Sequence, residues 1–221
     1  MLKQIFQLLL LFAMAAAAHV RADDYDQDCL PLKIEGRHGP FDYRSASQAE
    51  RKLVEGSHFD EHYQAYKLGK KKLRKRSDSI IETPAAGFGY TLWAFPNHHM
   101  ALVAIEDLGS KQKSERLDGL QLRVHCYFQR AVRFVPNDGL VRALYGYYYA
   151  RRNEPAKADI QIAEAINHHP DNVNVRVYSA TAYLEMGQPE KAAEHVKAAY
   201  AAGYPFPGLR QRLEKAGQSL N

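Results

Sequence analysis

The 221-residue sequence predicts an all-α fold: a short α-solenoid of about three helical hairpins with a capping helix, preceded by an irregular N-terminal segment. Two observations lead to this prediction. Small and aromatic residues repeat about every 34 residues between residues 139 and 205. Proline turns also recur at Pro96, Pro136 and Pro170, which are 40 and 34 residues apart. About three such units are needed for a stable stack, so the chain is close to the minimum.

Residues 1–22 have the pattern of a signal peptide. Lys3 provides a positive charge, residues 5–18 form an apolar run, and Val20-Arg21-Ala22 before Asp23 reads as a cleavage site. A membrane anchor needs roughly 20 apolar residues, and this run is too short. We therefore expect export and cleavage, which would make the mature protein periplasmic or secreted.

Export gives the two cysteines a structural meaning. In an oxidising compartment Cys29 and Cys126 are the only pair that can form a disulfide. Such a bond would tie the N-terminal segment onto the repeats. The alternative is that both cysteines are free thiols, with Cys126 buried and Cys29 without a structural role.

The segment 23–83 shows weak periodicity and is predicted to be irregular with some helix. Residues 36–44 are rich in glycine, proline and aromatic residues, which indicates an ordered loop. Residues 46–54 could form a short helix or a strand, and a clearer helical pattern begins at Asp60. Residues 77–89, which contain Thr83-Pro84-Ala85-Ala86-Gly87-Phe88-Gly89, are expected to be a linker or hinge.

The helix that starts at Asp60 leads into a polybasic run at residues 67–76. Seven of its ten residues are basic, and they are Lys67, Lys70, Lys71, Lys72, Arg74, Lys75 and Arg76. The whole chain has a formal charge of +5, so without this run it would be mildly acidic, at 5 − 7 = −2. One interpretation is a solvated helix end; the other is a dock for an anionic lipid or polysaccharide surface or an acidic partner. Nucleic acid is not expected, because no recognition motif accompanies the run.

Residues 84–204 carry the repeats. Two units place small residues and tyrosines at matching positions and end at a proline: Gly146, Tyr149, Ala158, Ala165 and Pro170 in one, and Ala180, Tyr183, Ala192, Ala199 and Pro205 in the other. Small residues are required where two helices cross closely. This pattern resembles tandem tetratricopeptide repeats. An earlier unit, with helices at residues 100–108 and 120–134 and a polar loop at 109–119, would hold six extra residues. Residues 205–221 then provide a capping helix with a polar outer face.

The wider chain is similar to a family of small exported tetratricopeptide proteins of Gram-negative bacteria. The residues that carry this similarity lie at 39–44, 54–59 and 95–102. That family has no settled activity, so the resemblance implies a compartment and a fold but no mechanism.

A catalytic or metal site is not expected. The best cluster is Glu55, His58 and His62, which would share one face of a continuous helix and could bind a divalent metal. Gly56 and Ser57 are expected to interrupt that helix, so structural roles are favoured over a metal-dependent enzyme. Nucleophile elbows, phosphate loops and C-x-x-C pairs are absent from the sequence, and we expect no cofactor.

The resemblance to tetratricopeptide repeats implies that the first helix of each unit lines a groove for a peptide or helix of a partner. The corresponding positions are Val103, Asp107, Leu140, Ala143, Tyr147, Arg151, Asn174, Val177, Thr181 and Glu185. The Lys-Asn-Arg carboxylate clamp of that superfamily is not reproduced, which favours a more apolar and aromatic contact. We expect a non-enzymatic scaffold for another envelope protein, with binding of an anionic envelope surface through residues 67–76 as the alternative.

Overall fold

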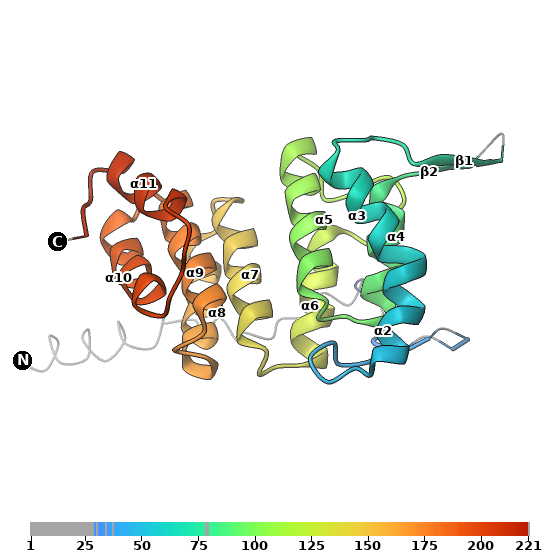
Figure 1. Cartoon of the computed structure of the whole chain (residues 1–221), viewed down its shortest axis with the longest axis horizontal. Helices are drawn as coiled ribbons and strands as arrows, with labels where there is room; N and C mark the ends of the chain where they lie inside the picture. Colours follow the sequence, from blue (N-terminus) through green and yellow to red (C-terminus); the bar gives the residue numbers. More distant parts are fainter. Residues whose placement is uncertain (1–28, 30, 34, 37, 78–79, 221) are drawn as a thin grey trace, which may run out of the picture.

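The computed structural model describes residues 29, 31–33, 35–36, 38–77 and 80–220, with the backbone alone at 74–77 and 80–81. The described chain is a row of helices with one short β-hairpin, which confirms the all-α prediction (Figure 1). The predicted signal peptide at 1–22 lies outside the described residues. The elements are α2 (Gln48–Val54), η2 (Glu55–Phe59), α3 (Asp60–Lys67), β1 (Arg74–Ser77), β2 (Ile80–Glu82), α4 (Pro84–Ala94), α5 (His99–Gln112), α6 (Val124–Phe134), α7 (Gly139–Ala150), α8 (Pro155–His168), α9 (Val173–Glu185), α10 (Pro189–Ala201) and α11 (Gly208–Lys215).

The elements α2, η2 and α3 follow one another without a break. Ser47 begins the run with a capping box, in which its hydroxyl accepts the Glu50 N–H and the Glu50 carboxylate accepts the Ser47 N–H. Gly56 and Ser57, which were expected to interrupt a helix, instead lie in the π-helical turn η2. A π-turn absorbs one extra residue without ending the helix, so this prediction was wrong.

The predicted linker at 77–89 is also wrong, because its described residues include strand β2 and the first half of helix α4. Pro84 occupies the first turn, where its missing N–H costs no hydrogen bond. Gly87 is a close-approach position: a Cβ there would overlap the carbonyl oxygen of His58 and the ring of His62. Gly87 therefore serves packing against η2 and α3, and Gly89 faces Leu120 and Tyr127 instead.

The three recurring turns start helices α5, α7 and α9 in the same way. The side chains of His98, Asp138 and Asn172 each accept a backbone N–H from the first turn that follows. Within the pairs α7/α8 and α9/α10 the helices pack extensively. Gly146 lies at the α7/α8 crossing, where a Cβ would come within 2.8 Å of Ile162. This is the close approach that the small-residue pattern predicts.

The unit formed by α5 and α6 differs from its expected boundaries. Helix α5 runs on to Gln112 and ends with Lys113 in a left-handed conformation, at φ 51°. Helix α6 starts at Val124 rather than near residue 120. The polar connection is therefore displaced along the chain, because α5 continues for one further turn.

The two largest hydrophobic clusters among the described residues form most of the interior. One lies among α3, α4, α5, α6 and α7, and the other among α7, α8, α9, α10 and α11. Helix α11 contributes the buried Leu209 and Leu213 to the second cluster, and its Arg212 pairs with Glu185 of α9 at 2.9 Å. The last helix thus covers the end of the array, as a capping helix does.

A disulfide between Cys29 and Cys126 confirms the predicted pairing and fastens the N-terminal segment to α6. Arg130, one turn further along α6, is fully buried and lies 4.0 Å above the Trp93 ring. Its guanidinium donates to the carbonyl oxygens of Pro31 and Leu32. These contacts hold Cys29, Pro31 and Leu32 against the first hydrophobic cluster.

Within the described residues, none of the helices combines the length and the apolar character that a membrane crossing requires. The disulfide is compatible with an extracytoplasmic protein.

Candidate functional site

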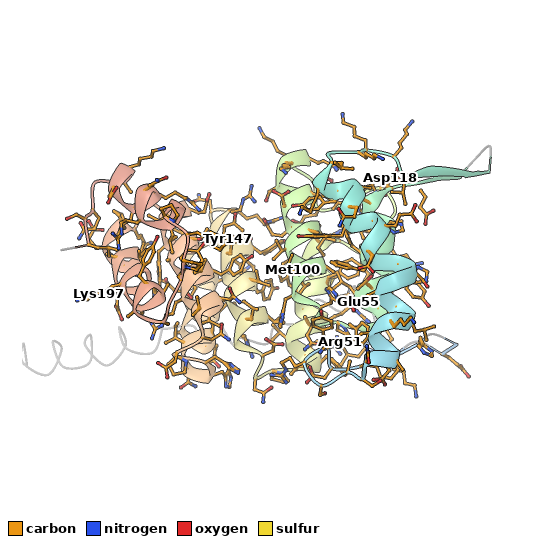
Figure 2. All side chains as sticks on the ribbon, in the orientation of Figure 1. Arg51, Glu55, Met100, Asp118, Tyr147 and Lys197 are labelled. Atoms are coloured by element: carbon orange, nitrogen blue, oxygen red, sulfur yellow. A yellow bond between two sulfur atoms is a disulfide. The ribbon has the colours of Figure 1, made fainter. Side chains whose placement is uncertain are left out.

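Helices α5, α7 and α9 lie one after another and present a shared face that carries tyrosines (Figures 1 and 2). Tyr147 of α7 reaches toward α9, where its ring centroid lies 6.1 Å from that of Tyr178. Both rings are half-buried, so each packs on one side and remains accessible on the other. We refer to the face formed by α5, α7 and α9 as the inner-helix face.

Two further tyrosines lie near this pair. Burial, together with the nearby phenols of Tyr147, Tyr204 and Tyr63, raises the pKa of Tyr178 to about 12. Tyr63 belongs to α3 and Tyr204 follows α10, and both are half-buried. Tyr147 and Tyr178 are therefore the tyrosine pair in ring contact on the inner-helix face, and Tyr63 and Tyr204 are near enough to affect the Tyr178 phenol.

A buried ion pair orients Tyr147. The carboxylate of Glu106, on α5, is almost fully buried and accepts Arg151 Nη1 at 3.0 Å, Arg152 Nη1 at 3.3 Å and Ser110 Oγ at 2.6 Å. Arg151 also donates to the Tyr147 hydroxyl at 3.3 Å and lies 5.5 Å from its ring centroid. Glu106 was not a candidate from the sequence, although an acidic residue between apolar neighbours on a helix is a signal of a buried charge that needs a partner.

Not all predicted groove residues line this face. Ala143 and Thr181 are buried, and Ala143 packs in the core with Ala165 and Val175, so neither is available to a partner. The reason is that the stacking of α7 on α9 covers the positions nearest the helix contact. The remaining predicted positions are at least partly exposed, and they are Val103, Asp107, Leu140, Tyr147, Arg151, Asn174, Val177 and Glu185.

The charged positions among them already have partners within the chain, as Arg151 does in Glu106. Asp107 accepts the Tyr66 hydroxyl at 2.7 Å and pairs with Lys111 at 2.6 Å. Glu185 pairs with Arg212 of the capping helix. Asn174 and Val177 of α9 and Tyr147 of α7 are therefore the positions best placed for a ligand.

The polybasic run does not continue the helix. Helix α3 ends at Lys67, and Gly69 adopts φ 68° with Lys70 N–H bonded to Ala65 O and Gly69 N–H bonded to Tyr66 O. This is a Schellman ending, which needs glycine at the left-handed position. The residues 70–72 then form an exposed turn, and the backbone of 74–76 enters strand β1.

Glu55, His58 and His62, the candidate metal ligands from the sequence, each contact a different partner. Glu55 accepts the Tyr43 hydroxyl at 2.9 Å and contacts His98 Nε2 at 3.2 Å. His58 stacks on Tyr90, and His62 contacts Glu82 at 3.3 Å. Burial lowers the pKa of His98 to about 4, despite its contact with Glu55, so this helix cap is a neutral imidazole at pH 7.

The described residues also bring His125 close to the cysteines, with its Nε2 3.6 Å from Cys29 Sγ. Cys29, His125 and Cys126 are near enough to one another to hold a metal ion. Both sulfurs, however, are joined in the disulfide, and a metal requires thiolates instead.

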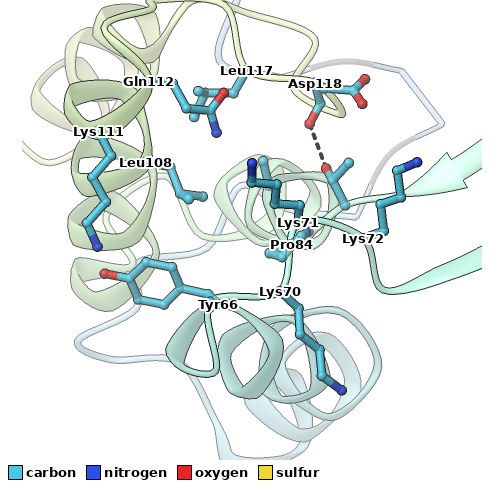
Figure 3. A pocket seen from close by; sticks show the side chains of 13 residues that line it. Tyr66, Lys70, Lys71, Lys72, Pro84, Leu108, Lys111, Gln112, Leu117 and Asp118 are labelled. Atoms are coloured by element: carbon cyan, nitrogen blue, oxygen red, sulfur yellow. Dashed lines mark hydrogen bonds between the residues drawn. The ribbon is translucent and has the colours of Figure 1, made fainter.

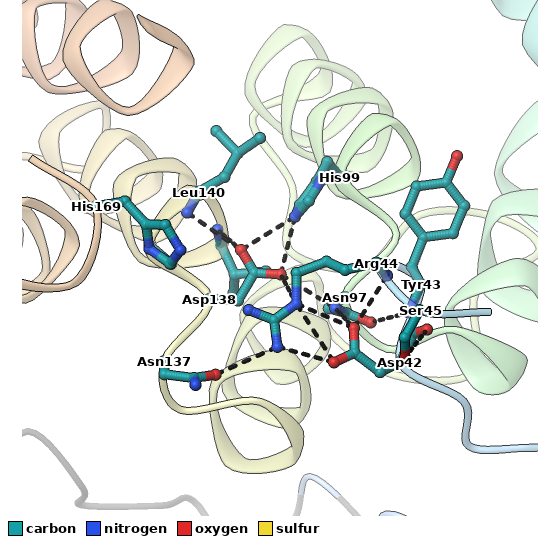
Figure 4. Close-up of polar contacts among 12 residues, drawn as sticks. Asp42, Tyr43, Arg44, Ser45, Asn97, His99, Asn137, Asp138, Leu140 and His169 are labelled. Atoms are coloured by element: carbon teal, nitrogen blue, oxygen red, sulfur yellow. Dashed lines mark hydrogen bonds and ion pairs between the residues drawn. The ribbon is translucent and has the colours of Figure 1, made fainter. Parts of the chain in front are cut away.

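A polar network joins the N-terminal loop to the turns before α5 and α7 (Figure 4). The buried Asn97 donates to Asp42 at 2.7 Å and to Asp138 at 3.0 Å, and His99 Nε2 lies 3.0 Å from Asp138. The Arg44 guanidinium holds the pKa of Asp42 well below its usual range, at about 2. Asp138 is thus a helix cap that also binds two side chains of the preceding turn.

This network predicts unequal losses at equivalent helix caps. Asp138→Ala should lower the free energy of unfolding by about 2 kcal/mol, because it removes the α7 cap and leaves Asn97 without one acceptor. Asn172→Ala, at the matching cap of α9, should lower it by only about 1 kcal/mol. Urea denaturation of both variants measures the difference. Equal losses would show that the contacts of Asp138 to Asn97 and His99 add nothing.

Comparisons with protein-family models, with curated proteins and with solved structures gave no match to this chain. The resemblance to tetratricopeptide repeats therefore stays a prediction from the spacing of the repeats.

Proposed function

We propose that this protein is a non-enzymatic scaffold of the periplasm that binds a peptide or a helix of another envelope protein on the inner-helix face. The observation behind this proposal is the pair of partly exposed tyrosines on that face, Tyr147 and Tyr178, whose ring centroids lie 6.1 Å apart. The proposed compartment rests on the signal-peptide pattern at 1–22, with the disulfide as support.

The chemistry of this face suits a partner with apolar side chains and a polar backbone. A tyrosine offers a large apolar ring and a hydroxyl, and it loses little conformational entropy on binding. Val103, Leu140 and Val177 add apolar surface beside these rings, and Asn174 adds an exposed amide. Arg151 is held by Glu106, so Tyr147 has a fixed orientation before the partner arrives.

The test is crosslinking in cells followed by mass spectrometry, with Tyr147→Ala/Asn174→Ala as the binding variant. Tyr90→Ala is the matched control, because Tyr90 is an exposed tyrosine on α4, outside this face. We expect wild type and the control to capture a discrete envelope protein and the binding variant to lose at least about nine-tenths of that capture, as expected for a central aromatic contact. Equal capture by all three proteins would overturn the proposal.

The alternative, binding of an anionic envelope surface through residues 67–76, is supported by one observation. Lys70, Lys71 and Lys72 are exposed, and no carboxylate among the described residues pairs with them. The salt dependence of binding distinguishes the two functions, because binding to a charged surface weakens steeply between low and moderate ionic strength. Capture on the inner-helix face should change much less.

A further inference from the structure

A pocket of about 600 Å³ opens beside the polybasic run, away from the inner-helix face (Figure 3). It lies between the end of α3, the start of α4, the second half of α5 and the connection from α5 to α6. Sites for small molecules typically measure about 300–1,000 Å³, so this pocket is large enough for one.

The pocket has an apolar wall and a basic rim of lysines. Apolar side chains from three segments line it: Pro84 and Ala85 of α4, Leu108 of α5 and Leu117 of the following connection. Tyr66 adds its ring on one side. Four lysines also line the pocket, and they are Lys70, Lys71, Lys72 and Lys111, against one carboxylate, that of Asp118.

The lysines fall into two groups. Lys111 pairs with Asp107, which also accepts the Tyr66 hydroxyl, so this side of the pocket is fixed by internal contacts. In Figure 3 the Lys70 side chain points away from Leu108 and Leu117, whereas the side chains of Lys71 and Lys72 lie beside Pro84. All three lysines are exposed and have no carboxylate partner among the described residues. They follow directly on the glycine-terminated end of α3, which directs the chain across the pocket.

We propose that this pocket binds a small amphipathic anion: an acyl or aromatic body with one carboxylate or phosphate group. The body covers Pro84, Ala85, Leu108 and Leu117, and the anionic group contacts Lys71 and Lys72. The binding is noncovalent and needs no cofactor.

The combination of an apolar wall and exposed lysines favours an amphipathic anion over an inorganic anion or a flat lipid surface. A free inorganic anion would satisfy the lysines but leave the apolar wall in contact with water, which forfeits the gain from covering it. A flat lipid surface would meet the exposed lysines and leave the cavity unfilled. Only a ligand that has both parts uses the wall and the rim together.

Calorimetric titration of the full mature protein tests the proposal, with decanoate as the probe at concentrations where it stays monomeric. We expect decanoate to bind with a stoichiometry of one. Decanol, which lacks the charge, and inorganic phosphate, which lacks the body, should each bind at least about tenfold more weakly. Comparable binding by either of them would overturn the proposal. Binding to vesicles that contain phosphatidylglycerol without binding to monomeric decanoate would also overturn it, and would assign the lysines to a membrane surface.

Variants locate the site. Lys70→Gln/Lys71→Gln/Lys72→Gln should weaken decanoate binding about tenfold or more, since it removes the three free charges. Lys52→Gln/Lys197→Gln/Lys215→Gln removes three exposed lysines elsewhere and should leave binding unchanged. All six positions are on the surface, so both variants should fold like wild type. Equal affinities of the two variants would contradict the assignment.

Amide shifts in two-dimensional NMR spectra provide a second readout that does not depend on substitutions. Decanoate should shift the amides of Gly69, Ala85 and Leu117 and leave those of α9 and α10 in place. Shifts confined to the inner-helix face would place the ligand in the wrong site. Because Tyr147→Ala should not change decanoate binding, failure of this proposal and failure of the scaffold proposal can be told apart.

Discussion

Gly87→Ala is expected to lower the free energy of unfolding by about 3 kcal/mol, although alanine normally stabilises a helix relative to glycine. The added Cβ would overlap the carbonyl oxygen of His58 and the buried ring of His62. Backbone cannot yield as a flexible side chain can, so α4 would have to move away from η2 and α3. Chemical denaturation followed by circular dichroism measures the change.

Gly56→Ala is the matched control for that experiment. Gly56 is also a helical glycine, but it is exposed, and a Cβ there would meet no atom within 4 Å. Alanine at this position should be neutral or should stabilise the protein by about 0.5–1 kcal/mol. If Gly87→Ala were as well tolerated as Gly56→Ala, the close packing of α4 on η2 and α3 would be contradicted.

Removal of the disulfide should have the largest effect on stability. Cys29 and Cys126 are 97 residues apart in the sequence. In the chain-entropy model a bond that closes such a loop stabilises the folded state by about 4–5 kcal/mol. We expect Cys29→Ser/Cys126→Ser to lose about that much, because the unfolded chain regains the freedom that the bond removed.

Two comparisons make this measurement specific. Wild type that has been reduced and alkylated should show a similar loss, whereas reductant should leave the stability of the double variant unchanged. Limited proteolysis should then cut the segment before α2 faster, even though Arg130 still binds the carbonyl oxygens of Pro31 and Leu32. A loss below about 1 kcal/mol would mean that packing and Arg130 hold this segment without the bond.

Much of the helical array could be predicted from the sequence, because its signals are local. The turns at 96, 136 and 170 each lead into a helix, and the side chains of His98, Asp138 and Asn172 cap these helices. The small residues at 146 and 158 mark a helix crossing, which is where the structure places them. The disulfide followed from the count of two cysteines.

Other features depended on contacts that no local pattern contains. Gly87 of α4 resembles a linker glycine until its neighbours His58 and His62 are known. The π-turn η2 keeps a helix continuous across Gly56 and Ser57, and such turns have no clear sequence signature. Local propensity favoured a break at both places, and tertiary packing overrode it.

The candidate site was predicted only in part for a similar reason. Tyr147 was correctly placed on the first helix of its unit, but its ion-paired support, Glu106, lies 45 residues away from Arg151 in the sequence. Ala143 and Thr181 share the same helical faces as the exposed positions, yet the stacking of α7 on α9 buries both. The spacing of a repeat predicts on which face of a helix a residue lies. How deeply that residue is buried depends on the neighbouring unit.

The central claim is that the inner-helix face binds another envelope protein, and site-specific photocrosslinking tests it most directly. A photoreactive amino acid placed at Asn174 or Val177 of α9 should crosslink one discrete envelope protein in cells. The same photoreactive group at Ala163, an exposed position on α8, should not capture it. No crosslink from α9, or the same product from both helices, would contradict the claim.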